Sequence, residues 1–449
     1  MANVSFPHRL VLNRFFLKLL GSDVYNLDLD PFRDATKSFI EESLELHEDD
    51  GTSRYYHELI RIIPSDSILS PEMLLDFDEN IKRHTNAINE KRSSKIRWKY
   101  FQYLSLLFTE IYLDWYFRDA DDLLNELNHH LDLFNNSLSD WGEKKKDLLK
   151  PFEDKDLKKL AFWNATGSGK TLLMHINIKQ YMHYLRKHRK EHELNRIIVL
   201  TPNEGLTHQH LEEFRLSSIS ASEFSKVAKN SDMFSGDVID VIDMNKLKEE
   251  GKKKTVSVDQ FEQNNLVMID EGHRGAKGEV WSEMRARLAK EGFTFEYSAT
   301  LGQAASSKPA LAEEYAKSIL FDYSYRYFHA DGFGKDYQIL NLDADQQTEA
   351  DKTNRQLYLT ACLLSFYQQN CVYRERHAKY KAFAIDKPLW VFVGSRVTAI
   401  RKDAGKDVSD VVDILLFLAE FVHNTHASIS NLGRLLSGDT GLLNSKNKD

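Results

Sequence analysis

A short glycine-rich run places the tightest constraint on what this chain can fold into. Residues 165–171 read ATGSGKT, and they stand between an apolar run at 160–163 and a helical pattern at 172–185. Gly167 and Gly169 let backbone N–H groups point into one concavity without a Cβ clash, and the following helix N-terminus adds partial positive charge. A strand, a glycine loop and a helix in this order predict a phosphate-binding loop.

The side chains of this loop point to a nucleotide with its metal. The Lys170 ammonium would reach the β- and γ-phosphates, and the Thr171 hydroxyl would bind Mg²⁺. The general pattern has glycine where this chain has Asn164. The expected nucleotide-binding residues are Thr166, Gly167, Ser168, Gly169, Lys170 and Thr171.

An acidic pair supplies the second half of the predicted site. Asp270 and Glu271 directly follow the apolar run at 266–269. Carboxylates at the C-terminal end of a parallel strand stand at the ligand-binding edge of an open α/β sheet. Asp270 would hold Mg²⁺, and Glu271 would orient and deprotonate the attacking water. An isolated acidic pair is more often a plain strand-ending turn, so this prediction depends on the phosphate loop.

Two kinds of apolar pattern divide the chain. From residue 157 to about 330, short continuous apolar runs such as 197–200 and 238–242 alternate with helical stretches, which is typical of a parallel sheet buried on both faces. Residues 1–155 instead carry long helical patterns, including a Ser70-Pro71 helix start and an aromatic helix at 97–118. The charged stretch at 143–159 is an exit linker or a solvated helix. We expect an α/β fold, a RecA-like P-loop parallel sheet with helices on both faces, preceded by an all-helical N-terminal domain.

Four motifs in order resemble those of superfamily 2 helicases and translocases of the DEAD/DEAH type. ATGSGKT and the DEGH of residues 270–273 are similar to motifs I and II, LTPN at 200–203 to motif Ia, and SAT at 298–300 to motif III. The run VFVGSR at 391–396 is similar to motif IV. The detailed pattern is most similar to the motor (Res) subunit of type III restriction enzymes and to related bacterial anti-phage defence helicases.

The resemblance implies a nucleic-acid-dependent ATP hydrolase that uses ATP and Mg²⁺. Asp270, Glu271 and Lys170 would be catalytic, with Thr171 and Asp270 at the metal. The residues implied to couple nucleotide state to nucleic acid are His273, Ser298 and Thr300, and those implied to contact nucleic acid are Thr201, Pro202 and Asn203. Taken alone, Thr201-Pro202 would be a helix-start turn, and the Ser298–Thr300 pair a plain strand end.

The last third of the chain fits this resemblance less well. A helix is expected over 347–380, then a buried strand at 389–393 that would open a second RecA-like domain. No later motif is matched, and Arg396, Arg401 and Arg434 do not lie in an arginine-finger context. The helix at 411–422 is apolar around most of its circumference, so it must be covered by the helix at 355–380, by further sequence or by a partner. We expect domains at 1–155, 156–335 and 336–449, and a motor that is truncated or split and needs a partner for full hydrolysis.

Composition and charge limit which class of protein this chain can belong to and which partners it can bind. The net charge of −8 excludes a general polycation, although the local basic clusters at 186–190 and 252–254 are either solvated faces or nucleic-acid contacts. The 2 cysteines cannot form a disulfide framework. The charges inside the most apolar stretch make it a poor membrane span, so we expect a soluble, cytoplasmic protein. Expected partners are nucleic acid, with DNA favoured, and a nuclease or methyltransferase subunit; the alternative is a non-motor ATP-binding switch within a larger defence complex.

Overall fold

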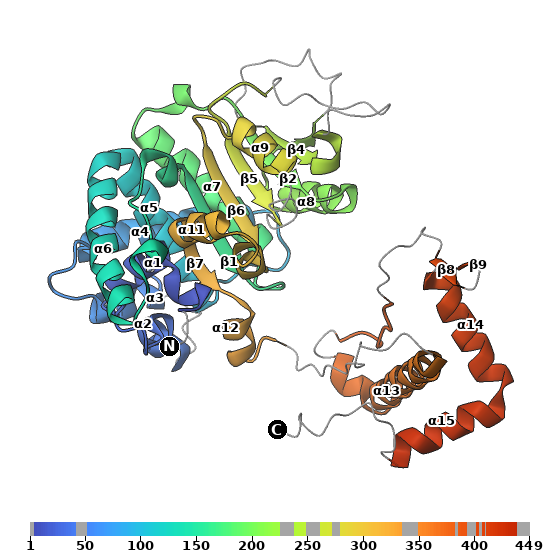
Figure 1. The fold of residues 1–449 in the computed structure, drawn as a ribbon. Coiled ribbons are helices and arrows are strands. Elements are labelled where there is room, and N and C mark those ends of the chain that lie inside the picture. The colour runs from blue at the N-terminus through green and yellow to red at the C-terminus, as the bar shows by residue number, and fades with distance from the viewer. Residues whose placement is uncertain are drawn as a thin grey trace. The chain divides into compact units, whose positions relative to one another are not determined.

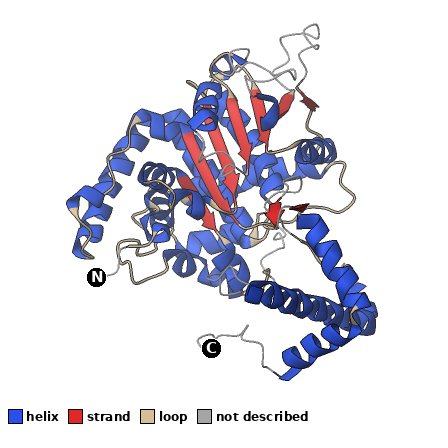
Figure 2. Cartoon of the chain, turned by 45° about the vertical axis from the view of Figure 1, so that its right-hand side comes forward, coloured by secondary structure: helices blue, strands red, loops and turns tan. Residues whose placement is uncertain are grey.

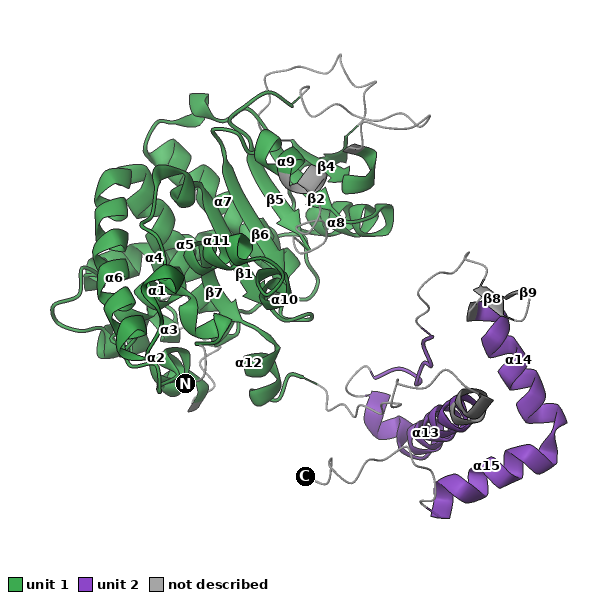
Figure 3. Cartoon of the chain, viewed as in Figure 1, with its two compact units in different colours: residues 1–335 green, residues 336–449 purple. Residues whose placement is uncertain are grey.

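The computed structural model describes ten stretches of the chain. They are residues 4–41, 52–224, 238–247, 261–271, 279–334, 349–381, 385–392, 401–403, 406–408 and 410–437. The chain divides into two compact units, residues 1–335 and 336–449, which we call unit 1 and unit 2 (Figures 1 and 3). Each unit is described by itself below.

A seven-stranded sheet forms the centre of unit 1 (Figure 2). Its strands are β1 (Lys159–Asn164), β2 (Ile197–Thr201), β3 (Ala221–Glu223), β4 (Ile239–Asp243), β5 (Leu266–Asp270), β6 (Phe293–Ser298) and β7 (Ile319–Tyr323). Their order is β3-β4-β2-β5-β6-β1-β7, and every neighbouring pair is parallel. The predicted α/β class with a parallel sheet is confirmed, and the strand that precedes the glycine loop, β1, is separated from the strand that precedes Asp270, β5, by β6 alone.

The apolar strand residues are continuous because both faces of the sheet are covered. Leu266 and Met268 belong to one hydrophobic core, whereas Val267 and Ile269 belong to another. Successive side chains of a strand point to opposite faces, so a strand buried on both sides has no polar face to alternate with. Two strands were not predicted from the sequence: the short strand β3, whose residues are partly exposed, and the buried strand β7.

The first part of unit 1 is helical, as predicted. It contains η1 (Phe6–Arg9), α1 (Val11–Leu19), α2 (Pro31–Glu41), α3 (Arg54–Ile62), α4 (Pro71–Asn89), α5 (Tyr100–Arg118) and α6 (Ala120–Asp140). The Ser70 side chain accepts a hydrogen bond from the Met73 backbone N–H and caps α4. Near the N-terminus, Leu10, Phe15, Phe16 and Leu20 are buried, and Leu19 is partly buried.

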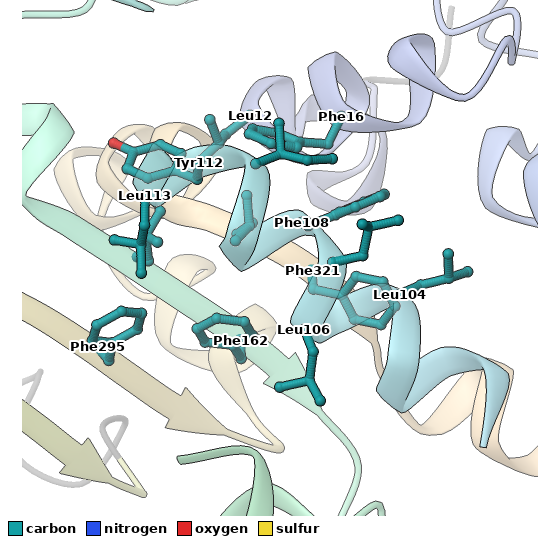
Figure 4. Packing of buried hydrophobic residues seen from close by; sticks show 14 of the residues in the cluster. Leu12, Phe16, Leu104, Leu106, Phe108, Tyr112, Leu113, Phe162, Phe295 and Phe321 are labelled. Carbon is teal, nitrogen blue, oxygen red and sulfur yellow. The ribbon is translucent and has the colours of Figure 1, made fainter. Parts of the chain in front are cut away.

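One continuous core joins these helices to the sheet. Figure 4 shows Phe16 of α1 and Phe108 of α5 packed with Phe321 of β7, and Phe162 of β1 lies in the same cluster. The ring centroids of Phe108 and Phe321 are 5.5 Å apart. The helical part of the chain therefore covers one face of the sheet within unit 1, and whether residues 1–155 also fold alone stays a prediction.

The charged stretch at 143–159 is neither a linker nor a solvated helix. It forms two short 3-10 turns, η2 (Lys145–Asp147) and η3 (Asp154–Lys158). Between them the side-chain amides of Asn128 and Asn135, both on α6, exchange hydrogen bonds with the backbones of Phe152 and Leu149. Because those two apolar side chains are buried, the segment is anchored despite its many charges.

Further helices complete the two layers around the sheet. They are α7 (Lys170–Lys187), η4 (Glu191–Glu193), α8 (Glu204–Leu216), η5 (Met244–Leu247), α9 (Glu279–Leu288), α10 (Leu301–Ala305), α11 (Pro309–Ser318) and α12 (Tyr325–Ala330). The alternating aromatic residues at 323–328 do not lie on one strand, because β7 ends at Tyr323 and α12 begins at Tyr325.

Unit 2 corrects two expectations. It contains α13 (Glu349–Lys381), the pair β8 (Arg401–Asp403) and β9 (Lys406–Val408), α14 (Asp410–His423) and α15 (Thr425–Ser437), and α13 confirms the predicted helix. Residues 389–392 form no strand, and Leu389 is 82% exposed. The helix expected to be buried nearly all round, α14, exposes most of its apolar side chains. An apolar run cannot become a buried strand without neighbouring strands to pair with it.

No helix in the described part of the chain is both long and apolar enough to cross a membrane.

Candidate nucleotide site

The glycine loop has the geometry that its sequence requires. Gly167 and Gly169 have φ angles of 88° and 93°, in the left-handed region where a side chain is strained. The Ala165 N–H donates to the Tyr323 carbonyl at 2.9 Å, and the Ser168 N–H donates back to the Ala165 carbonyl at 3.1 Å. The loop is thereby fixed between the ends of β1 and β7, and Gly169 caps the N-terminus of α7.

The fold brings together the lysine and the acidic residue that lie far apart in the sequence. Lys170 Nζ lies 3.6 Å from Glu271 Oε1, and 10% and 22% of these side chains are exposed. Lys170 Nζ also donates to the Asn164 carbonyl at 3.4 Å. Glu271 has a φ of 53°, which is unusual for a residue other than glycine and typical of strained functional positions. One cation and one carboxylate therefore meet beside the glycine loop.

Asp270, at the end of β5, has a partner that the sequence did not reveal. His210 Nε2 of α8 lies 2.9 Å from Asp270 Oδ2, and the exposed fractions are 2% for His210 and 8% for Asp270. No other hydrogen bond to Asp270 is found among the described residues, so its second carboxylate oxygen is available to another ligand. His210 lies on the buried side of α8, but a histidine at this position gives no sign in the sequence of a contact with Asp270.

The residues around the loop fit a phosphate and a hydrated cation. Both side-chain atoms of Asn164 and the hydroxyl of Ser168 are buried without a hydrogen-bond partner among the described residues. Buried polar atoms without partners are costly, and a bound ligand or water would satisfy them. Thr171 and Asp270 supply the hydroxyl and carboxylate oxygens that Mg²⁺ prefers. The site can thus hold a nucleotide phosphate chain with Mg²⁺.

Polar contacts between α5 and α7 position the helix that follows the loop. Asn177 Nδ2 donates to the Thr109 hydroxyl at 2.9 Å, and Gln180 Nε2 donates to Glu110 Oε1 at 2.7 Å. Tyr184 donates to the other oxygen of Glu110 at 2.5 Å. Burial raises the pKa of Glu110 to about 7, against the lowering effect of these donors. A seam of buried hydrogen bonds therefore fixes α7 against the helical part of unit 1.

Gln102 of α5 contacts the glycine loop itself. Its Nε2 donates to the Ser168 carbonyl at 2.8 Å, and its Oε1 accepts from the Lys99 N–H. A Cβ at Gly169 would lie only 2.5 Å from Gln102 Nε2, so the loop needs glycine there to admit the glutamine. The signal that could have found Gln102 was a single amide within an aromatic helix, which is too weak to use without the structure.

The remaining predicted residues differ in where they lie. Ser298 is buried at the end of β6, and its Oγ accepts from the Thr300 N–H at 3.1 Å. Thr201 is also buried, and its hydroxyl bonds to Thr207 Oγ1 at 2.6 Å, so it holds the turn before α8. The Asn203 side chain is exposed and accepts from the Leu206 N–H. The contacts of this segment with nucleic acid stay a prediction.

Three predicted features lie outside the described residues. His273 is one, residues 393–396 of the motif IV run are another, and the basic cluster at 252–254 is the third.

Comparison with known proteins agrees with the motifs. Residues 123–303 match the family described as "Type III restriction enzyme, res subunit", which is less than half of the chain. No curated protein matches it. Among solved structures, the UvsW helicase from bacteriophage T4 is 20% identical, with 37% of this chain and 54% of that chain covered and a TM-score of 0.26. The Sulfolobus solfataricus SWI2/SNF2 ATPase core in complex with dsDNA is 12% identical, with 59% and 60% covered and a TM-score of 0.26.

This chain thus spans 54% and 60% of the lengths of those two structures. The fold class follows from the parallel sheet itself. Residues 123–303 are similar to the Res subunit of type III restriction enzymes, and their ordered motifs resemble those of superfamily 2 helicases.

Proposed function

We propose that this chain is an ATP-dependent motor, a helicase or translocase that acts on double-stranded DNA in restriction or anti-phage defence. The observation that carries the proposal is the meeting of Lys170 and Glu271, 3.6 Å apart, beside the glycine loop. Phosphate binding alone would fit many ATP-binding proteins. A carboxylate beside the phosphate-binding lysine also provides the base that hydrolysis needs.

Each residue of the site then has a role in hydrolysis. The loop N–H groups of 167–171 and the Lys170 ammonium bind the phosphates, while Thr171 and Asp270 hold Mg²⁺. His210 orients Asp270 through its hydrogen bond. Glu271 accepts a proton from the water that attacks the γ-phosphorus in line, and ADP leaves. Mg²⁺, when bound, neutralises charge that develops on the phosphate oxygens.

Movement on nucleic acid requires the nucleotide state to reach other parts of the protein. We assign this coupling to Ser298, the last residue of β6, and to Thr300 just after it, because β6 lies beside both β1 and β5. His273 would join them. Thr201, Pro202 and Asn203 would lie along the phosphate backbone of the nucleic acid, and a group at a helix N-terminus reads position rather than sequence there.

The restriction or defence role and the partners follow from the family description alone. A Res-type segment implies a nuclease or methyltransferase subunit as a partner.

ATP hydrolysis measured with and without double-stranded DNA tests the proposal. We expect DNA to raise the rate of the unaltered chain, and we expect Lys170→Ala to abolish hydrolysis under both conditions. Lys145→Ala, a change at an exposed lysine in η2, is the matched control and should hydrolyse ATP at the unaltered rate. Absence of DNA stimulation, or stimulation that survives Lys170→Ala, would contradict the motor.

A second candidate is an ATP-binding switch without motor activity. The hydrogen bonds between α5 and α7, and the contact of Gln102 with Ser168, favour it because they link the nucleotide loop directly to the helical part of unit 1. A switch would bind ATP through Lys170 but show no stimulation by DNA, so the same assay separates the two candidates.

A further inference from the structure

A separate cavity lies in the helical part of unit 1. Its volume is about 430 Å³, and residues of α3, α4 and the segment at 95–103 line it. Ligand cavities in proteins typically measure about 300 to 1,000 Å³. None of its described lining residues belongs to the nucleotide site around Lys170. The cavity is therefore large enough for a small ligand, and the proposed function does not use it.

The walls of the cavity are aromatic and held in place. Tyr55 and Tyr103 are buried with their ring centroids 4.6 Å apart. The Trp98 indole N–H donates to Thr85 Oγ1 at 2.7 Å, and the Tyr55 hydroxyl donates to the Trp98 carbonyl at 2.9 Å. Aromatic side chains pinned in this way present fixed flat surfaces, on which another planar ring would pack favourably.

A buried carboxylate adds one polar feature to these walls. Asp78 is 2% exposed. Its Oδ1 accepts from the Ser53 hydroxyl and from the Tyr103 hydroxyl, and its Oδ2 accepts from the Ser53 N–H at 3.0 Å. A carboxylate offers about four acceptor positions, so with these partners among the described residues one position on Oδ2 is left for a donor. A ligand ring that carries an N–H group would satisfy it.

The mouth of the cavity has the opposite charge. Lys82, Lys95 and Arg97 line it together with a single acidic residue, Glu90. Lys95, Arg97 and Glu90 are exposed. Lys95 Nζ donates to the Asn89 carbonyl at 2.6 Å, which directs its ammonium along the rim. Among the described residues at the mouth, the exposed cations Lys95 and Arg97 outnumber the carboxylate of Glu90, which favours an anionic group on the part of the ligand that reaches solvent.

We propose that this cavity binds a nucleotide unit, with its base between the aromatic walls and its phosphate at Lys95 and Arg97. An N–H group on the base meets Asp78. The same chemistry can come from a free nucleoside monophosphate or from one unit of a single strand of nucleic acid. The proposal is independent of ATP hydrolysis at Lys170.

Direct binding measurements on the full chain test it. Lys170→Ala is introduced throughout, so that the ATP site does not contribute. GMP, AMP and UMP are titrated separately, followed by a mixed-sequence single-stranded DNA oligonucleotide and by ribose 5-phosphate, which has no base. The cavity variants are Lys95→Glu with Arg97→Glu, which reverses the rim charge, and Asn86→Trp, which fills the mouth. Lys145→Glu with Lys146→Glu is the matched control on another surface.

We expect at least one monophosphate to bind, and both cavity variants to weaken it about tenfold or more, while the control leaves it unchanged. If only the oligonucleotide binds and shows this loss, the nucleotide unit comes from a strand. Two results would overturn the proposal. One is that neither cavity variant weakens the binding of any nucleotide or oligonucleotide, and the other is that ribose 5-phosphate binds as tightly as the monophosphates.

Discussion

Two helices, α5 in unit 1 and α14 in unit 2, share an apolar sequence pattern but differ in their surroundings. Both carry apolar residues around most of their circumference, which predicts burial on all sides. In α5 nearly every residue is buried, whereas in α14 only Phe417 is buried among the described side chains. Leu415 and Leu416 of α14 are 60% and 57% exposed.

The difference lies in what each helix packs against. α5 lies between α7 and the other N-terminal helices, and its residues also reach β7. α14 packs against α15, with no strand of a buried sheet among the described residues of unit 2. An apolar pattern therefore predicts that a helix needs a cover, but it does not identify the cover.

The largest effect should come from removing a ring from the covered helix. Phe108 of α5 is fully buried and packs against Phe16 and Phe321. We expect Phe108→Ala to lower the free energy of unfolding of unit 1 by about 3 to 5 kcal/mol, because the core cannot collapse into the space. Urea denaturation followed by circular dichroism measures it, and a loss below about 1 kcal/mol would show that α5 is not packed as described.

Ionisation of a buried carboxyl group on the same helix should change the free energy of unfolding by a somewhat smaller amount. Burial raises the pKa of Glu110 from 4.5 to about 7. The folded chain thus keeps a proton that the unfolded chain loses near pH 4.5, so the stability from this group is complete below pH 4.5 and declines until about pH 7. The loss corresponds to roughly 3 kcal/mol. Unfolding free energies measured from pH 4.5 to 7 should show it.

Glu110→Gln provides the matched control for this pH dependence. Glutamine keeps the size of the side chain and does not ionise, so the decline between pH 4.5 and 7 should become smaller by that amount. Equal slopes in the unaltered chain and the variant would mean that Glu110 is ionised in both states.

Removal of the N-terminal cap of α4 should lower the free energy of unfolding by less. Ser70→Ala removes the hydrogen bond from the Met73 N–H, and we expect a loss of about 1 kcal/mol in the free energy of unfolding. Ser70→Asp, which keeps an acceptor at this position, should restore most of it. If both variants lose the same amount, the cap does not stabilise α4.

The smallest effect should come from the exposed helix. Leu416→Ala in α14 should change the free energy of unfolding by less than about 0.5 kcal/mol, because the leucine is already exposed to water. Paired with Phe108→Ala, it tests the contrast between α5 and α14 directly. A loss of 2 kcal/mol or more would mean that a partner or another part of the chain covers α14.

The sequence was sufficient for the elements whose signal is local. The glycine loop, the Ser70 cap and the buried strands β1, β2, β4, β5 and β6 each follow from a few neighbouring residues. Gln102 and His210 could not be predicted, because their roles come from contacts with residues 66 and 60 positions away. The strand predicted at 389–393 is not formed over its described residues, 389–392. An apolar run forms a strand only when other strands lie beside it, and the resemblance to motif IV could not show whether such strands are present.

Glu271 gives the most direct test of the proposed hydrolysis, through single-turnover ATP hydrolysis with the protein in saturating excess over ATP. Glu291 is the matched control, since it is also a glutamate with a positive φ, 58° against 53° for Glu271, and its side chain pairs instead with Lys158 at 3.1 Å. We expect Glu271→Gln to bind ATP normally but to hydrolyse it about 10²-fold or more slowly, and Glu291→Gln to match the unaltered chain. Hydrolysis by Glu271→Gln at the unaltered rate would contradict the assignment of the site.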